Sequence, residues 1–325
     1  MGGKRNNRLR AAFVFLVIGA QLALSAYLNQ FRFSPDPILP ARLWSEDGLA
    51  SLAVSGARPA LPVGAGLGNK LYGPVAEEDL PWYAAPPLDL TDARLRYSAY
   101  LFINAFRTTL PDPILQEEHN VTTAAEYLCG TIIEPGAIFS LNQAIGPRTK
   151  NRGFGPGPLY ANGQIGTTTG GGICKVATTM YNLGVHSDLH LVERHPHSMP
   201  VPYVPPGRDA TILWGLKDVR FLNNKGHPLV LWAAVQDTTL YIALYGQYDP
   251  PLVEWQREEM NRVPTWTIKR RNRNLAPGEM RSLEGAPGLT VRTWVEVEYP
   301  GGIKAKRELG VDYYRPLPNY IEYGP

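Results

Sequence analysis

The sequence predicts an α+β protein in which a helix that begins at a cysteine packs on a mainly antiparallel sheet, with a small all-β appendage toward the C-terminus. Apolar residues recur at helical spacing over residues 116–129 and again over 173–185. Between residues 211 and 244, short apolar runs alternate with turn residues, which is typical of consecutive strands. Between residues 291 and 309, apolar and charged residues alternate around a Pro-Gly-Gly turn, which predicts a two-stranded unit.

The first 28 residues predict export. Four basic residues within the first ten precede an almost purely apolar stretch, Ala11 to Leu28. This stretch is about long enough to cross a bilayer, although Ala23 and Ser25 would also suit a cleavage site, so an anchor and a cleaved signal both stay open. We favour an uncleaved anchor. The basic flank then predicts a cytoplasmic N-terminus and a single-pass protein of the cell membrane whose remaining chain lies outside.

The chain divides into four predicted segments. Residues 1–28 form the signal anchor, and residues 29–92, rich in Pro, Ala and Gly without a sustained period, form a spacer. Residues 93–248 form the main domain. Residues 249–325 form the β appendage, with its alternating pattern and a Pro- and Tyr-rich end.

The main domain begins with elements of mixed type. Residues 97–106 are apolar and aromatic enough for a strand or a buried helix, and their periodicity does not decide between them. The helix predicted over residues 116–129 ends at Gly130, the residue type that most often follows a helix. A turn at Pro135-Gly136 then leads into a short strand.

A long irregular segment follows over residues 146–172, rich in glycine and proline. Compact domains seldom carry such a segment without a function. It runs directly into the second helix, so Cys174 lies in the first helical turn. The strands expected after this helix are Thr211–Leu213, Val219–Leu222, Leu229–Val235 and Leu240–Leu244.

Composition limits the classes of partner. The 325 residues carry a net charge of only +3, and no basic run alternates with aromatic residues, so nucleic acid is not an expected partner. No cofactor is expected. Basic and aromatic residues between Trp255 and Arg273 could favour an anionic surface, although the solvated face of a strand or loop is the simpler explanation of the basic residues.

The two cysteines of an exported chain suggest one disulfide, but their surroundings differ. Cys129 ends an apolar helical pattern, whereas Cys174 follows a run of three glycines. We therefore expect independent thiols, with a disulfide as the alternative.

Cys174 has the surroundings of a nucleophile. The start of a helix favours a thiolate through unpaired N–H groups and the positive end of the dipole. The glycines before it allow a substrate to approach the backbone, where N–H groups can stabilise an oxyanion. His195 or His197 could act as the base after the helix, and Asp209 could orient the imidazole.

Two simpler interpretations compete with catalysis. A cysteine in an apolar helix is more often a small packed hydrophobe, and a loop histidine is usually solvated. Metal binding is the other: His186, His190, His195, His197 and Cys174 offer suitable ligand types, but the spacings of known zinc sites are absent, so no metal is expected.

A series of motifs then resembles a known family. The motifs are Glu134–Asn142, Ile145–Thr149, Gly170–Cys174 with Thr178–Asn182, Glu193–Ser198, Tyr203–Pro205 and Gly207–Ala210. In order and spacing they resemble the VanW family over about residues 93–248. The stretch from Glu284 to Pro318 looks like the G5-type β module that often follows a VanW domain.

The resemblance implies a reaction. The family name comes from a gene that accompanies glycopeptide-resistance operons, and some members are described as L,D-transpeptidases that build 3–3 peptidoglycan crosslinks. Cys174 would attack the carbonyl after the third residue of a tetrapeptide stem, with His197 as base and Asp209 orienting it or positioning substrate. Backbone N–H groups around Gly172–Lys175 would form the oxyanion hole.

The resemblance also implies peptidoglycan stem peptides as the partner. The residues expected to contact them or the oxyanion are Gly170, Gly171, Gly172, Lys175, Arg194, His195, Ser198, Tyr203 and Arg208. Lys175 departs from the family, in which glutamine is common at this position, and it could hold the thiolate or a stem carboxylate or mark a member that has lost or changed activity. The alternative function is a non-catalytic accessory protein that binds peptidoglycan or a glycopeptide, with Cys174 structural.

Overall fold

The computed structural model describes residues 72–110, 115–161 and 164–325. The predicted signal anchor and residues 29–71 of the predicted spacer lie outside this part of the chain. Within it, no helix is long and apolar enough to cross a membrane.

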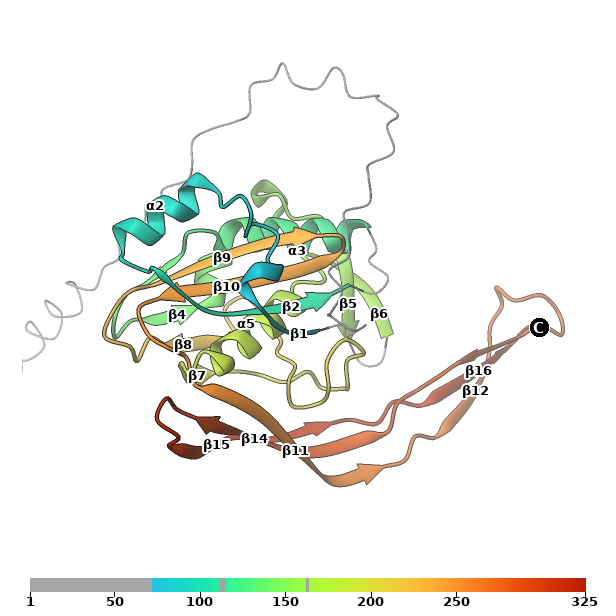
Figure 1. Cartoon of the computed structure of the whole chain (residues 1–325). Coiled ribbons are helices and arrows are strands. Elements are labelled where there is room, and N and C mark those ends of the chain that lie inside the picture. The colour runs from blue at the N-terminus through green and yellow to red at the C-terminus, as the bar shows by residue number, and fades with distance from the viewer. Residues whose placement is uncertain (1–71, 111–114, 162–163) are drawn as a thin grey trace, which may run out of the picture. The chain divides into compact units, whose positions relative to one another are not determined.

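An antiparallel sheet of five strands forms the centre of the fold (Figure 1). Its strand order is β1 (Tyr72–Val75), β2 (Leu101–Thr109), β10 (Thr239–Gly246), β9 (Leu229–Gln236) and β3 (Ile132–Ile133). β9 and β10 are joined at Asp237 and Thr238, both with positive φ, as a tight hairpin turn requires. β1 comes from the segment predicted to be spacer, so part of that segment belongs to the sheet.

The two faces of this sheet carry different cores. Alternate residues of β9 point to opposite faces, as the pleat dictates: Leu229 and Leu231 join one cluster, and Val230 and Trp232 join the other. The helices α3 (Leu115–Leu128) and α5 (Cys174–His186) cover the first face. The helix α2 (Leu88–Arg96) contributes to the second cluster with Leu90.

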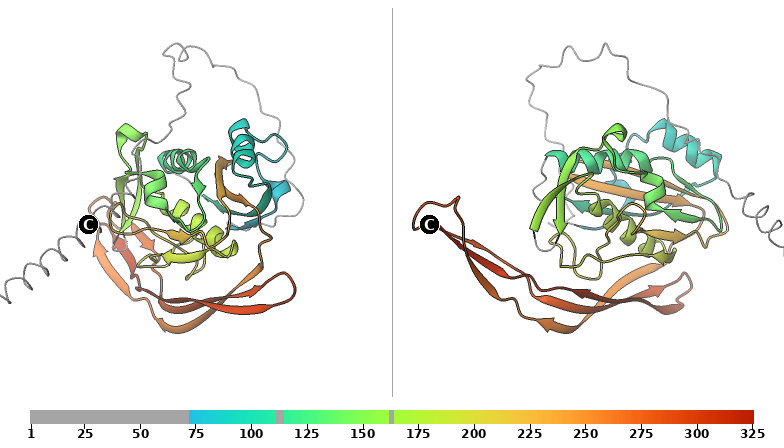
Figure 2. Two further views of the ribbon diagram at one scale, coloured as in Figure 1. Left: turned by 90° about the vertical axis from the view of Figure 1, so that its left-hand side faces the viewer. Right: turned by 180° about the vertical axis from the view of Figure 1, so that it is seen from behind.

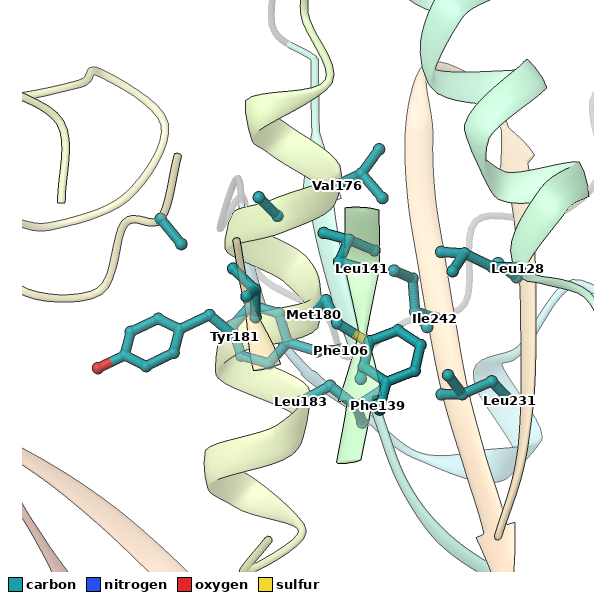
Figure 3. Close-up of a cluster of buried hydrophobic side chains, with 14 of the residues drawn as sticks. Phe106, Leu128, Phe139, Leu141, Val176, Met180, Tyr181, Leu183, Leu231 and Ile242 are labelled. Atoms are coloured by element: carbon teal, nitrogen blue, oxygen red, sulfur yellow. The ribbon is translucent and has the colours of Figure 1, made fainter. Parts of the chain in front are cut away.

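Helix α5 packs its apolar side onto the sheet (Figure 3). Val176, Met180 and Leu183 follow helical spacing and are fully buried. They face Leu231 of β9 and Ile242 of β10. The N-terminus of α5 is therefore held in a fixed position by the main core.

Smaller elements complete the main domain. β4 (Ile138–Ser140), β8 (Arg220–Leu222) and β7 (His190–Glu193) form a second antiparallel sheet, and β5 (Pro156–Ala161) pairs with β6 (Gln164–Thr169). Ser140 caps the short helix α4 (Leu141–Ile145) by accepting a hydrogen bond from the Gln143 amide. The 3-10 turns η2 (Glu77–Asp79) and η3 (Lys150–Arg152) lie in connections.

The C-terminal strands form two sheets in an extended ribbon (Figure 2). The first has the order β11 (Leu252–Val263), β14 (Gly288–Glu298) and β15 (Lys304–Tyr314). The second has the order β12 (Thr267–Arg271), β16 (Asn319–Tyr323) and β13 (Met280–Leu283), with β12 parallel to β16. The predicted two-stranded unit is the β14–β15 hairpin, and β11 adds a third strand to it.

The fold is α+β with mainly antiparallel sheets, as predicted. Both long helices lie within two residues of their predicted bounds, and the strand alternative for residues 97–106 is correct from Leu101 onward. The prediction of a strand at Thr211–Leu213 is wrong, because this segment makes only an isolated bridge between Leu213 and Lys217. Its side chains instead line a cavity beside Cys174.

Candidate active site

Cys174 is the first residue of α5 and is half-buried. Its sulfur lies 3.2 Å from the Thr211 hydroxyl, and the His197 imidazole lines the same cavity and interacts with the thiol electrostatically. A thiol at a helix start, with two donors beside it, is in the environment that stabilises a thiolate.

His197 is held by Asp209. The imidazole Nδ1 lies 2.7 Å from Asp209 Oδ2, and the backbone amide of His197 donates to the same oxygen at 2.7 Å. Because Nδ1 is occupied by the carboxylate, Nε2 is the nitrogen left for the thiol. A backbone hydrogen bond from Thr211 to the His195 carbonyl aligns the two segments that carry these residues. The structure thus brings Cys174, His197 and Asp209 into one series, in which His197 is hydrogen-bonded to Asp209 and lines the same cavity as the thiol.

The electrostatics of this series favour an ion pair. Burial opposes ionisation of Cys174, but the hydrogen bond and charge of His197 and the Thr211 hydroxyl outweigh it and lower the thiol pKa to about 7. Burial likewise opposes the charged form of His197, yet its bonds to Asp209 and Cys174 raise its pKa to about 9. Between these values the pair is thiolate and imidazolium.

Asp209 is fully buried and has two further partners from other elements. The Arg194 guanidinium lies 3.3 Å from Asp209 Oδ1, and the Tyr314 hydroxyl donates to the same oxygen at 2.5 Å. Burial would raise the pKa of this carboxyl, but hydrogen bonds and charge from His197 and the charge of Arg194 hold it below its ordinary value. Asp209 therefore stays ionised.

The glycine run before Cys174 is shaped by close contacts. A Cβ on Gly171 would lie 2.1 Å from the carbonyl carbon of Gly157 in β5, so no other residue fits. Gly172 has φ +96°, a conformation that side chains rarely adopt. Asn120 of α3 donates to the Gly171 carbonyl at 2.9 Å and fixes the run from behind.

A cavity of about 290 Å³ opens over the thiol. Three cationic side chains line it, Arg148, Lys175 and Lys217; Lys175 is paired with Glu117, and the other two form no ion pair with an acidic side chain of the described residues. Arg148 donates only to neutral acceptors, Asn142 Oδ1 at 2.7 Å and the Gly146 carbonyl at 3.2 Å. The cavity lining also includes Gly170, Gly171, Gly172, Cys174, Lys175, His197, Tyr203 and Thr211.

Fewer backbone amides are free to stabilise an oxyanion than was predicted around Gly172–Lys175. The Lys175 amide already donates to the Gly172 carbonyl at 3.0 Å, and the Gly170 and Gly171 amides are also used internally. The amides of Gly172, Ile173 and Cys174 remain as candidate donors.

Lys175 does not reach into the cavity as a free cation. Its ammonium group is bonded to the Glu117 carboxylate of α3, and both side chains are buried. Its charge is therefore already compensated, which argues against the predicted role in holding the thiolate or a stem carboxylate.

Four other residues predicted to contact substrate do not line this cavity. Arg194 is buried between Asp209 and Asp312, and His195 bonds Glu193 at 3.0 Å. Ser198 is exposed. The Arg208 guanidinium donates to Asn182 and lies 4.6 Å from the Trp255 ring centroid.

Sequence reasoning missed four residues around the thiol: Glu117, Arg148, Thr211 and Lys217. Arg148 lies within one of the motifs that carry the family resemblance, and Thr211 directly follows another, so the sequence offered a reason to consider both as site residues. It offered none for Glu117 and Lys217, because only the fold brings them to the cysteine.

Both cysteines are free thiols. The Cys129 thiol donates to the Ala233 carbonyl at 3.0 Å, and burial raises its pKa to about 11. Cys129 is therefore a packed, unreactive thiol.

Among the described residues, no group of three or more potential ligands could hold a metal ion. His186, one of the ligands considered above, accepts a hydrogen bond from the Trp255 indole at 3.2 Å. Burial and the charge of Arg208 lower the pKa of His186 to about 3, so it is neutral and already bonded.

Comparison with known proteins identifies the region that carries this site. The family model described as VanW like protein matches residues 116–245, which include Cys174, His197 and Asp209. The chain carries a VanW-like domain.

Two curated proteins are similar to this VanW-like domain. One is the uncharacterized protein YoaR of Bacillus subtilis, 39% identical over 128 residues. The other is the vancomycin B-type resistance protein VanW of Enterococcus faecalis, 28% identical over 146 residues. These matches cover 39% and 43% of this chain, which spans 42% and 53% of the lengths of the two relatives.

Two solved G5 domains are also similar to part of the chain. The G5 domain of an IgA1 protease covers 25% of the chain at 20% identity, with a TM-score of 0.16. The G5 domain of HP0197 covers 23% at 19% identity, with a TM-score of 0.13.

Proposed function

We propose that this chain is a cell-wall protein that acts outside the membrane as a cysteine acyltransferase of the L,D-transpeptidase type on peptidoglycan stem peptides. The observation that carries the proposal is the series of Cys174, His197 and Asp209, in which the thiol and the Asp209-bonded imidazole line one cavity. A buried structural cysteine needs neither a charged histidine partner nor a lowered pKa.

The geometry supports a two-step acyl transfer. The Cys174 thiolate attacks the carbonyl carbon of the third stem residue, and the amides of Gly172 to Cys174 stabilise the oxyanion. The C–N bond to the terminal D-residue breaks, and the imidazolium of His197 gives its proton to the leaving amine. The amine of an acceptor stem then attacks the thioester, passes a proton to His197 and expels the thiolate, which leaves a 3–3 crosslink.

The charge of the cavity supports an anionic donor peptide. Arg148 and Lys217 place two cations beside the thiol, and neither forms an ion pair with a carboxylate of the described residues. The terminal D-residue of a tetrapeptide ends in a carboxylate, which pairs well with a guanidinium. Binding the donor by this end places the preceding peptide bond near the sulfur.

The placement outside the cell belongs to the same proposal. The basic and apolar N-terminal 28 residues serve as the membrane anchor, and residues 249–325 serve as a G5-like module beside the wall. One relative is named for resistance to vancomycin, a name that fits a role in the wall.

The test is mass spectrometry of the full chain incubated with a disaccharide-tetrapeptide. We expect a thioester adduct and 3–3 dimers with the native protein, and a loss of roughly a thousandfold or more in product for Cys174→Ser. Cys129→Ser is the matched control and should retain activity, because its thiol is packed away from the cavity.

The opposite result has a definite meaning. If the native protein and Cys174→Ser bind tetrapeptide equally and neither gives an adduct or a dimer, the enzyme proposal fails. The chain is then a peptidoglycan-binding accessory protein.

A further inference from the structure

We propose that Asp312 and Tyr314 of the C-terminal module are positioning residues for the cysteine site, acting through Asp209. The module is then a structural part of the site and not only an appendage that binds elsewhere. The inference concerns how the thiolate is formed.

Two buried side chains of β15 act on Asp209: Tyr314 contacts its carboxylate directly, and Asp312 contacts Arg194, which bonds Asp209. Tyr314 is fully buried, and its hydroxyl accepts a hydrogen bond from the Gly207 amide at 2.7 Å while it donates to Asp209 Oδ1 at 2.5 Å. Asp312, two residues earlier on the same face, accepts from Arg194 Nη1 at 2.6 Å with both oxygens. Arg194 in turn donates to the Asp209 backbone carbonyl at 2.8 Å.

These contacts hold the carboxylate at the oxygen that does not bond His197. One oxygen of Asp209, Oδ2, bonds the imidazole, and the other, Oδ1, bonds Tyr314. A carboxylate fixed at both oxygens cannot rotate away from the imidazole. The strand β15 therefore sets the angle at which Asp209 meets His197.

Two carboxylates, Asp209 and Asp312, lie among two cations, His197 and Arg194, so the positive and negative charges of this group nearly balance. The groups that face Asp209 are His197, Arg194 and Tyr314, with Asp312 and Tyr181 beside Arg194. The Arg194 guanidinium forms ion pairs with both Asp312 and Asp209, so its positive charge is shared between two carboxylates. Neutralising Asp312 removes one negative charge and turns Arg194 fully toward Asp209, which weakens the support for the imidazolium and hence for the thiolate.

The test is the pH dependence of Cys174 alkylation by iodoacetamide in the full chain, followed by mass spectrometry. We expect Asp312→Asn and Tyr314→Phe to move the midpoint of the alkylation rate to higher pH and to slow alkylation at pH 7 by roughly fivefold or more. Tyr313→Phe is the matched control: it lies between them on the opposite, 55% exposed face and should keep the native midpoint.

A native midpoint in both Asp312→Asn and Tyr314→Phe, or a shift to lower pH, would overturn the inference. Should Tyr314→Phe fail to fold, the nearly isosteric Asp312→Asn decides alone. The inference rests on the proposed pairing of Cys174 with His197, but alkylation needs no peptidoglycan. A failed transpeptidase assay therefore leaves this readout intact.

Discussion

Cys174 and His197 share a proton whose position depends on pH. With pKa values of about 7 for the thiol and about 9 for the imidazole, the reactive ion pair exists between them. Below the lower value the thiol is protonated, and above the higher value the imidazole can no longer supply the proton for the leaving amine. Acyl transfer should therefore follow a bell-shaped pH profile with limbs near these values.

The contribution of His197 can be measured at the thiol. Replacing it by glutamine removes the cation that outweighs burial, so the pKa of Cys174 should rise from about 7 toward its ordinary value of 9.0. Alkylation at pH 7 should slow on the order of 50-fold. The measurement is the rate of iodoacetamide labelling against pH.

The neighbouring histidine provides the control. His195 bonds Glu193 and does not line the cavity, so His195→Gln should leave the labelling midpoint unchanged. Equal shifts in the two variants would mean that general charge, and not the pairing with His197, activates the thiol.

The position of the α5 N-terminus depends on how the glycine run before it packs against β5. Gly171→Ala would place a methyl group 2.1 Å from the Gly157 backbone, which cannot move like a flexible side chain. We expect a loss of about 1–3 kcal/mol in the free energy of unfolding, together with slower alkylation of Cys174. Urea denaturation measures the first effect.

Gly226→Ala is the comparison for this element. A Cβ at Gly226 meets nothing within 4 Å, so this variant should be as stable as the native chain. If Gly171→Ala matches it in both stability and labelling, the close contact with β5 does not constrain the helix start.

The helices and central strands were predictable because their buried residues leave a clear apolar pattern in the sequence. The apolar spacing over residues 173–185 directly reflects the buried side of α5, and the runs over residues 229–244 reflect strands buried on both faces. β11 escaped prediction because its residues are mostly exposed, so no alternation marks it. Thr211–Leu213 looked like a strand because apolar cavity lining and strand core have the same composition.

The series of Cys174, His197 and Asp209 was within reach of sequence reasoning, because the helix start and the family motifs point to these residues. The residues that hold this series in place could not be predicted from the sequence. Glu117 beside Lys175 and Tyr314 beside Asp209 lie 58 and 105 residues away from their partners along the chain. No local pattern encodes such a contact, since it arises only when separate elements pack together.

At the scale of the whole molecule, a second set of hydrogen bonds, separate from those at Asp209, joins the C-terminal hairpin to the main domain. Arg307 of β15 donates to Asp188 Oδ1 at 2.8 Å and to the Val185 carbonyl at 3.2 Å, at the C-terminal end of α5. Arg307→Gln should lower the free energy of unfolding by about 1 kcal/mol, because the buried Asp188 loses one of its charged partners. Urea denaturation of the full chain measures this.

Arg292 is the matched arginine on the same hairpin. It pairs with Glu308 at 2.9 Å where both side chains are more than 40% exposed, and such pairs contribute little. Arg292→Gln should therefore leave the unfolding midpoint within error. An equal loss in both variants would show that the hairpin's own stability, and not its attachment, is being measured.

The packed Cys129 thiol has a practical consequence for the living cell. Because its pKa is about 11 and that of Cys174 about 7, the two sulfurs differ on the order of a thousandfold or more in thiolate content at neutral pH. An electrophilic dye should thus mark one position of the unmodified protein. Its attachment would report occupancy of the cavity by wall fragments or inhibitors without any engineered tag.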